Sequence, residues 1–270
     1  MKHRHALMLL SVALPICVLL RAIQICFTVD SATGFIKQQY SVISVLITVI
    51  ICAAVASIGL LATTLEGVKQ NSVKPRPAVA IASALAGGMF IYQTVAGFSA
   101  AYGAWYDMLL VLLSLASAFV FVAYGLKNIY EYKFPPLILV IPVVYYVVKL
   151  ISVFVSTSAL ALVTENIFLI FTNSVLLWFT FEFASFENEI GDTAKKPKRL
   201  FASGLAAVIL CAVASLPKLF LSTLGKMQLS NGDISAALGN AAMGIFILVY
   251  IVCNFIDKFE NTKSVGKHSA

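Results

Sequence analysis

The sequence predicts an all-α integral membrane protein, an eight-helix transmembrane bundle with both termini in the cytoplasm. Three observations carry this prediction. Of the 270 residues, 60% are hydrophobic and only 11% are charged, whereas about a quarter of the residues in soluble domains are charged. Eight apolar segments each approach the ~20 residues needed to cross ~30 Å of hydrocarbon. Finally, the basic residues gather in alternate connections between these segments.

The predicted spans follow one another too closely to leave room for a further folded domain. The first of them resembles a secretory signal in having a basic start and an apolar core. However, Arg21 and more apolar residues follow this core in place of a small-residue cleavage site, so we interpret it as a retained helix. The eight spans cover residues 6–27, 41–65, 78–98, 107–127, 136–157, 165–186, 200–222 and 234–256.

Basic residues in short connections mark the cytoplasmic side of a membrane protein. Fourteen lie on one side of the predicted spans and two on the other, and one span more or fewer would destroy this asymmetry. The net charge of +7 therefore reflects topology, and predicts contact with a lipid bilayer rather than with nucleic acid. Short loops and the lack of an Asn-x-Ser/Thr sequon favour a bacterial cytoplasmic membrane. The fourteen are Lys2, Arg4, Lys69, Lys74, Arg76, Lys127, Lys133, Lys195, Lys196, Lys198, Arg199, Lys258, Lys263 and Lys267, and the two are Lys37 and Lys226.

An internal duplication is indicated by the fourth and eighth spans, which align at an offset of 126 residues. The halves would be residues 1–134 and 135–258, followed by a cytoplasmic tail at 259–270. Because each half has an even number of spans, the two share one orientation, as in parallel repeats about an axis along the membrane normal. Chance similarity among apolar helices is the alternative. The matched pairs are Asp107 and Asp233, Tyr124 and Tyr250, Asn128 and Asn254, and Glu131 and Asp257.

Small residues recur every four positions in the third and seventh spans, a spacing that lets helix backbones approach closely in lipid. We therefore expect these two helices to be central. The residues are Ala80, Ala84 and Gly88 in the third span and Ser203, Ala207 and Cys211 in the seventh.

Polar groups near the cytoplasmic ends are interpreted as structural. The repeated tyrosine and asparagine pairs lie one turn apart on a helix face, which favours interhelical or interfacial hydrogen bonds over ligand contact. Glu182, near the inner end of the sixth span, is interpreted as an ion-pair partner of the basic cluster at 195–199 rather than as a proton-coupling carboxylate.

Three basic residues lie inside the spans, namely Arg21, Lys149 and Lys218. A charge at the centre of a span costs roughly 2.5–3.5 kcal/mol on insertion scales, so such residues tend to face a cavity or a partner. All three fall in the outer half, and the repeat would place Arg21 and Lys149 across from each other. Together they predict a ligand-binding vestibule for an anion such as a carboxylate or phosphate.

Further polar side chains on the same or neighbouring spans complete this predicted site. The alternative is that the long basic side chains snorkel to the outer headgroups or pair with acids there. The added residues are Gln24, Gln93, Tyr145, Tyr146 and Asn173.

No sequence motif specifies a chemical reaction. Walker, HExxH, GxSxG and CxxC motifs are absent, and the five cysteines lie in apolar runs without metal-ligand spacing, so we assign no cofactor, metal or catalytic residue. The favoured function is a small-molecule transporter, or its membrane-embedded substrate-binding component, for an anionic or zwitterionic solute. Two alternatives stay open: a membrane sensor or accessory subunit that binds a membrane partner protein, and a lipid-modifying enzyme.

Overall fold

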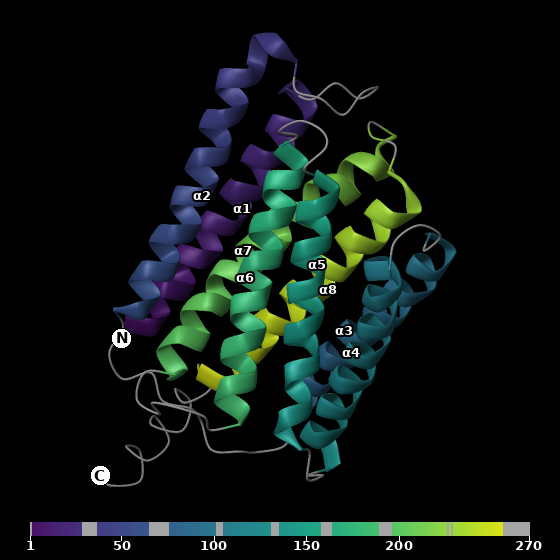
Figure 1. Cartoon of the computed structure of the whole chain (residues 1–270). Coiled ribbons are helices and arrows are strands. Elements are labelled where there is room, and N and C mark those ends of the chain that lie inside the picture. Colours follow the sequence, from purple (N-terminus) through teal and green to yellow (C-terminus); the bar gives the residue numbers. More distant parts are fainter. Residues whose placement is uncertain are drawn as a thin grey trace, which may run out of the picture.

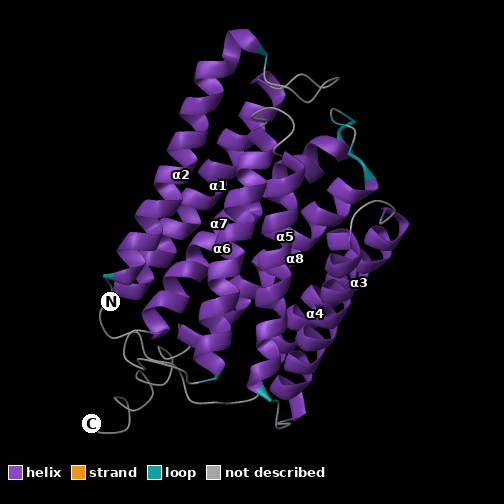
Figure 2. Cartoon of the chain, viewed as in Figure 1, coloured by secondary structure: helices purple, strands orange, loops and turns teal. Residues whose placement is uncertain are grey.

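Eight long helices carry the chain back and forth between two ends, and the residues described in the computed structural model contain no strand (Figures 1 and 2). The structure describes residues 2–28, 37–64, 76–100, 105–130, 135–157, 164–188, 196–225, 227 and 229–255. The helices are α1 (Lys2–Thr28), α2 (Ser41–Thr63), α3 (Pro77–Ala100), α4 (Trp105–Tyr130), α5 (Val140–Thr157), α6 (Thr164–Glu187), α7 (Lys196–Thr223) and α8 (Asn231–Phe255), with 3₁₀ turns η1 (Gln38–Tyr40) and η2 (Pro136–Leu139) before α2 and α5.

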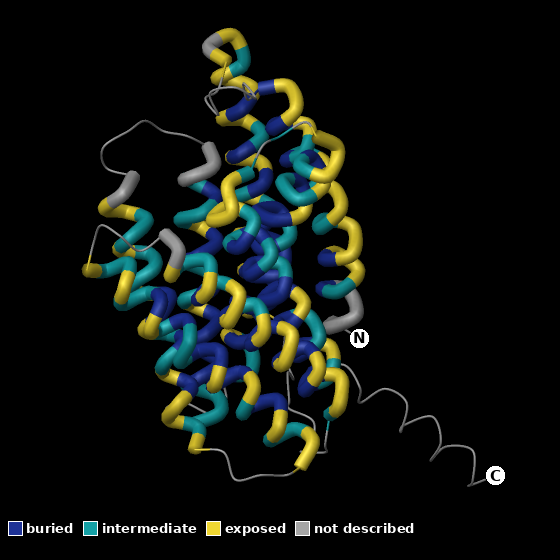
Figure 3. Tube along the Cα trace, turned by 90° about the vertical axis from the view of Figure 1, so that its right-hand side faces the viewer, coloured by how far each residue is buried: buried dark blue, intermediate teal, exposed yellow. Residues whose placement is uncertain are grey.

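All eight helices are long and apolar enough to cross a membrane, which confirms the predicted spans to within a few residues at each end. Large apolar side chains such as Leu46, Val49 and Phe154 are exposed on the outside of the bundle, whereas the buried residues gather at its centre (Figure 3). An α-helix satisfies its own backbone hydrogen bonds, so this apolar exterior is compatible with lipid. The chain is therefore a multi-pass membrane protein by the length and composition of its helices.

The helices are arranged as a central group of four flanked by two hairpins (Figure 1). The α1–α2 hairpin packs against α7 on one side. On the other side the α3–α4 hairpin packs against α8 and α5. The central group is α5, α6, α7 and α8, in which α7 contacts both α6 and α8.

The two ends of the bundle differ in charge. We call the end at which α1, α3, α5 and α7 begin the lysine-rich end, and the other the opposite end. The end of α8 lies at the lysine-rich end with the start of α1 (Figure 1). Among the described side chains, the lysine-rich end holds five basic residues and two acids, and the opposite end holds Lys37, Asp107 and Asp233. The five basic residues are Arg76, Lys127, Lys196, Lys198 and Arg199, and the acids are Glu182 and Glu187. Glu131, Lys69, Lys74, Lys133, Lys195, Lys226 and the predicted tail at 259–270, together with Asp257 and Lys258, lie outside the described residues.

The expectation that the third and seventh helices are central holds for α7 only. Every residue from Leu200 to Cys211 is buried, including the three small residues of the predicted stripe. In α3, by contrast, Ala84 and Gly88 are exposed. Ala80, the first residue of the stripe, is buried and does lie at a close approach to α4: a Cβ added to Gly125 of α4 would lie 3.0 Å from the Ala80 carbonyl oxygen. The stripe in α3 therefore continues onto the surface of the bundle.

Aromatic rings fill the centre between α4, α6 and α8. The ring of Phe246 packs edge-on against Phe121, with centroids 5.2 Å apart, and against Phe183 at 5.9 Å. Phe183 in turn packs edge-on against Tyr124 at 5.1 Å and Tyr250 at 5.0 Å. Edge-to-face pairs of this kind contribute about 0.5–1.5 kcal/mol each beyond the area they bury. This aromatic cluster joins both halves of the chain towards the lysine-rich end.

Candidate functional site

Arg21 lies in α1, two turns before the opposite end, and is buried with 1% of its surface exposed. Its Nη1 donates a hydrogen bond of 2.7 Å to Oε1 of Gln24. Its guanidinium carbon lies 4.1 Å from the centroid of the Phe168 ring in α6, which is cation–π geometry. Arg21 therefore points into the bundle, towards α6, and does not extend along the surface to the headgroups.

Gln24 fixes the position of this arginine. Its Nε2 donates to the carbonyl oxygen of Ser44 at 2.8 Å, and lies 2.9 Å from both the Ser44 and Thr48 hydroxyl oxygens. Because the amide nitrogen is held by α2, the amide oxygen is turned towards Arg21. The three polar side chains of α1 and α2 thus hold Arg21 in one orientation.

Arg21 and Lys218 line the same small cavity, of about 50 Å³, at the opposite end of the bundle. Asp233 lines it too, and its carboxylate also accepts a hydrogen bond of 2.7 Å from the Ser230 hydroxyl at the start of α8. We call this the Arg21 cavity. It is lined by Arg21, Phe168, Leu169, Ala214, Lys218, Asp233, Ala236, Ala237 and Asn240.

Lys149 does not line the Arg21 cavity. Its Nζ lies 5.4 Å from the ring centroid of Tyr145 and 5.9 Å from that of Tyr146, and these two rings pack edge-on at 5.1 Å. The structure thus brings Arg21, Gln24 and Lys218 together. It places Lys149 in a separate group with the two tyrosines of α5.

A second and larger cavity, of about 280 Å³, lies between α3, α4 and α5. Within it, the Tyr145 hydroxyl donates to Oε1 of Gln93 at 3.1 Å. The Nε2 of Gln93 reaches the Ser235 carbonyl oxygen of α8 at 3.3 Å. We call this the Asp107 cavity. It is lined by Gln93, Gly97, Asp107, Leu110, Val111, Ser114 and Tyr145.

Gly239 of α8 makes room for Gln93. A Cβ added to this glycine would lie 1.9 Å from Nε2 of Gln93, far inside van der Waals contact. The glutamine therefore lies flat against the backbone of α8. Its amide connects the Asp107 cavity to the helix that lines the Arg21 cavity from its other face.

Asn173, the remaining predicted site residue, is fully buried in α6. Among the residues that the structure describes, neither its Nδ2 nor its Oδ1 finds a hydrogen-bond partner. A buried amide without partners is costly, about 1–3 kcal/mol for each unsatisfied group. Asn173 lines neither of the two cavities.

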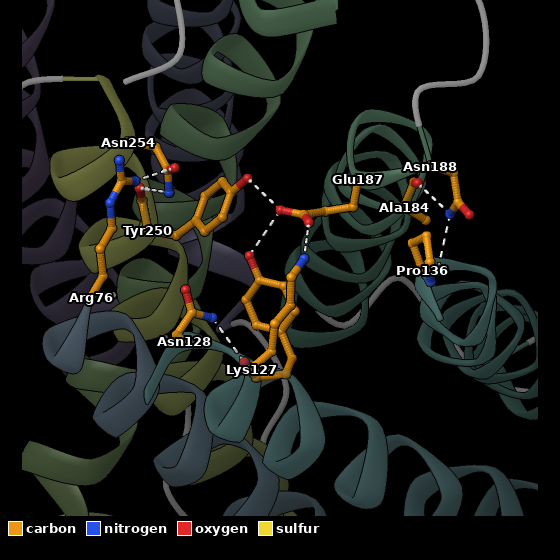
Figure 4. A network of polar contacts seen from close by, with 10 residues as sticks. Arg76, Lys127, Asn128, Pro136, Ala184, Glu187, Asn188, Tyr250 and Asn254 are labelled. Atoms are coloured by element: carbon orange, nitrogen blue, oxygen red, sulfur yellow. Dashed lines mark hydrogen bonds and ion pairs between the residues drawn. The ribbon is translucent and has the colours of Figure 1, made fainter. Parts of the chain in front are cut away.

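The sequence interpretation did not identify Glu187, the last residue of α6, as a centre of contacts (Figure 4). The hydroxyls of Tyr124 and Tyr250 lie 2.9 Å and 3.4 Å from its Oε1, and Nζ of Lys127 lies 2.8 Å from its Oε2. We call these four residues the Glu187 cluster. The predicted interhelical hydrogen bonds of the two tyrosines are thereby confirmed, with Glu187 as their acceptor.

The repeated asparagines adjoin this cluster. The Nδ2 of Asn128 donates to the Tyr124 carbonyl oxygen at 2.8 Å, and that of Asn254 donates to the Tyr250 carbonyl oxygen at 2.9 Å. Arg76, just before α3, donates from Nη1 to Oδ1 of Asn254 and from its backbone N–H to the Asn128 carbonyl oxygen (Figure 4). The end of α8 is thus tied to the start of α3.

Glu182 lies one turn and a half before the Glu187 cluster and is buried. Within the described part of the chain it forms no ion pair with a basic residue, and Nζ of Lys196 at the start of α7 has no hydrogen-bond partner either. Lys195 of the predicted partner cluster lies outside the described residues. The described residues likewise contain no group of three or more His, Cys, Asp or Glu side chains that could hold a metal ion.

Comparisons of the chain with protein-family models, with curated proteins and with solved structures find no match.

Proposed function

We propose that this membrane protein binds a small anionic or zwitterionic solute in the Arg21 cavity, as a transporter or as the membrane-embedded binding component of one. The single observation that carries the proposal is that Arg21, although fully buried, lines one cavity with Lys218. Burying a guanidinium in a membrane protein is expensive, and such residues usually mark a ligand or ion path. A carboxylate bound between the two basic side chains would offset this cost.

The third charge of the cavity favours a zwitterion. Asp233 lies in the first turn of α8 and lines the cavity with the two basic residues. Its carboxylate suits an ammonium group, while the planar guanidinium of Arg21 suits a carboxylate. Asn240 lies about two turns beyond Asp233 on the same face of α8. It adds an amide that donates and accepts hydrogen bonds. The small volume of the cavity limits the bound group to a few heavy atoms, such as the head of an amino acid.

The closed lysine-rich end supports an outward-facing site. There the aromatic cluster and the Glu187 cluster join α4, α6 and α8, on the lysine-rich side of the two cavities. Parallel repeats about a normal axis, which the 126-residue offset indicates, are a feature of several transporter folds. Both observations fit a protein that admits solute from the opposite end while its lysine-rich end is sealed.

A second candidate function is that of a membrane-embedded accessory subunit. An apolar groove of about 410 Å³ lies between α2, α6 and α7, and the exposed rings of Phe171 and Trp178 line it. Apolar grooves with exposed aromatic residues are common at protein interfaces. Co-purification of one membrane protein in fixed stoichiometry, lost in Trp178→Ala, is the result that would favour this candidate.

The test of the first proposal is a thermal-shift screen of the purified protein in nanodiscs against amino acids, carboxylates and phosphates. A ligand at 100 times its Kd adds about 2.7 kcal/mol to the free energy of unfolding. We expect a hit whose effect is lost in Lys218→Met and in Arg21→Met. The control is Lys37→Met, which removes an exposed lysine at the same end.

If Arg21→Met fails to fold, Arg21→Lys keeps the charge but removes the two-pronged geometry, and should weaken the hit. A hit that is unchanged in both Lys218→Met and the foldable Arg21 variant would refute the site. No hit from any anionic or zwitterionic class would refute the function.

A further inference from the structure

The two cavities occupy equivalent places in the two halves of the chain. The four residues of α4 that line the Asp107 cavity and the four residues of α8 that line the Arg21 cavity match one to one at the offset of 126. Residues on one face of any helix recur every three or four positions. Helix geometry does not, however, require the lining residues of two helices to start at matching positions in the sequence. The matched pairs are Asp107 and Asp233, Leu110 and Ala236, Val111 and Ala237, and Ser114 and Asn240.

The preceding helix of each half contributes in the same way. Gln93 and Gly97 of α3, four residues apart, line the Asp107 cavity, and Ala214 and Lys218 of α7, also four apart, line the Arg21 cavity. Each half therefore builds a cavity at the opposite end from its third and fourth helices. The first helix of the other half adds one side chain to each cavity, Tyr145 of α5 and Arg21 of α1, and α6 adds Phe168 and Leu169 to the lining of the Arg21 cavity.

The two cavities differ in the charge of the residues that line them. Lys218 of α7 gives the Arg21 cavity a second basic side chain, whereas α3 contributes Gln93 and Gly97 to the Asp107 cavity, and Lys149 lies against the tyrosine rings and outside its lining. Asp107 is thus the charged residue in the lining, which includes no basic side chain. Its carboxylate forms no hydrogen bond or ion pair with any other residue that the structure describes.

We infer that the Asp107 cavity is a second binding site, distinct from the proposed anion site, and that it takes a small molecule bearing a protonated amine. The ammonium would pair with Asp107, while the hydroxyl of Ser114 and Oε1 of Gln93 offer further acceptors. Ser114 already exchanges a hydrogen bond of 2.6 Å with Thr94, which holds its oxygen in place. Tyr145 adds an aromatic side chain to the lining, and its hydroxyl holds Gln93 in place.

The volume of about 280 Å³ suits a whole small amine rather than a single ion. Because the cavity lies at one end of the bundle, the amine can come from solution or from an ethanolamine lipid headgroup. Both sources share the primary ammonium that Asp107 recognises.

Ethanolamine is the probe for this site, and ethylene glycol, which has a hydroxyl in place of the ammonium, is its uncharged comparator. Binding is measured by titration calorimetry on the full chain in phosphatidylglycerol nanodiscs, which contain no amine lipid. We expect the wild type to bind ethanolamine and not ethylene glycol. Asp107→Asn should weaken binding at least tenfold, because it removes the negative charge that would pair with the ammonium in the partly buried cavity.

A steric variant keeps the test independent of the charge change. Ser114→Leu fills the cavity while leaving Asp107 intact, and should weaken ethanolamine binding to a similar degree. Its matched control is Ser57→Leu on the exposed face of α2, which should bind as the wild type does. Equal binding of ethylene glycol, or unchanged binding in Asp107→Asn and Ser114→Leu, overturns the inference.

A second arm uses nanodiscs of phosphatidylethanolamine. Extra thermal stability of the wild type in this lipid, lost in Asp107→Asn, assigns the amine to the headgroup and supports the site. Ethanolamine binding without such lipid dependence assigns it to a free amine and supports the site equally. The absence of both effects rejects it, whatever the outcome of the anion screen on the Arg21 cavity.

Discussion

Tyr124 and Tyr250 direct their hydroxyls at the same oxygen atom, Oε1 of Glu187, and each of them is 63 residues away from it in the sequence. The acid therefore stands at the midpoint of the 126-residue offset that relates the two tyrosines. It also accepts from Lys127, so one carboxylate joins α4, α6 and α8 at the lysine-rich end (Figure 4).

The two tyrosines should differ in their contribution to stability. Tyr124→Phe removes a hydrogen bond of 2.9 Å to a carboxylate and should lower the free energy of unfolding by about 1.5–3 kcal/mol. Tyr250→Phe removes a contact of 3.4 Å and should cost under about 1 kcal/mol. Reversible unfolding in mixed micelles gives both values.

A double-mutant cycle with Glu187→Gln shows whether the carboxylate is responsible. In that background the cost of Tyr124→Phe should fall to about 0.5–1.5 kcal/mol, the value for neutral hydrogen bonds. An unchanged cost in both backgrounds would mean that the Tyr124 hydroxyl does not act through the charge of Glu187, because Tyr124→Phe keeps the ring that packs against Phe183.

Replacing Gln24 should loosen the α1–α2 hairpin. Gln24→Leu removes the interhelical hydrogen bonds to Ser44 and Thr48 and the acceptor of Arg21, and should lower the free energy of unfolding by about 1–2 kcal/mol. Ser57→Ala is the control, since this exposed hydroxyl bonds within its own helix to the Ala53 carbonyl oxygen. Equal stability of the two variants would show that Gln24 does not hold Arg21 in place.

The position of Gln93 depends on the glycine beneath it. Gly239→Ala should displace Gln93 from its contacts with Ser235 and Tyr145 and cost about 1–3 kcal/mol, as overpacking does. Gly88→Ala, where an added Cβ meets no atom within 4 Å, should leave stability unchanged or raised. Thermal unfolding of both variants checks this, and a Gly239→Ala protein as stable as Gly88→Ala would contradict it.

Orientation in the membrane can be read from cysteine labelling. In a variant without the five native cysteines, Lys37→Cys should react with a membrane-impermeant maleimide added to intact bacterial cells. Arg199→Cys should react only after the membrane is permeabilised, because basic connections stay in the cytoplasm. The reverse pattern would invert the predicted topology.

The sequence predicts where the helices lie but not which way most of them face. Hydropathy marks spans clearly because crossing a bilayer demands a minimum apolar length. It carries little information on rotation about the helix axis, so it could not separate a buried Arg21 from a snorkelling one. The contacts that decide the matter, with Gln24 beside it and with Phe168 of α6, depend on packing between distant segments.

The same limit explains the other differences. A small-residue stripe permits close packing on either side of a helix, and in α3 the partner is reached through Ala80 and Gly125 rather than through Gly88. The predicted repeat pointed to Tyr124 and Tyr250. Their acceptor, Glu187, has no matching acid at the same offset, because Leu61 stands 126 residues before it. An acid that accepts from both members of a matched pair has no matching position of its own, so a search for matching positions does not find it.

The burial of α7 also constrains how the protein is made. The helix is covered along most of its length by α1, α2, α6 and α8, and three of these partners, α1, α2 and α6, are translated before it. Until α7 inserts into the bilayer, the α1–α2 hairpin lacks the helix against which it packs and remains a separate unit. This part of the architecture can therefore be completed only after α7 has been inserted, so chains truncated after α6 should remain loosely associated and exposed to membrane proteases.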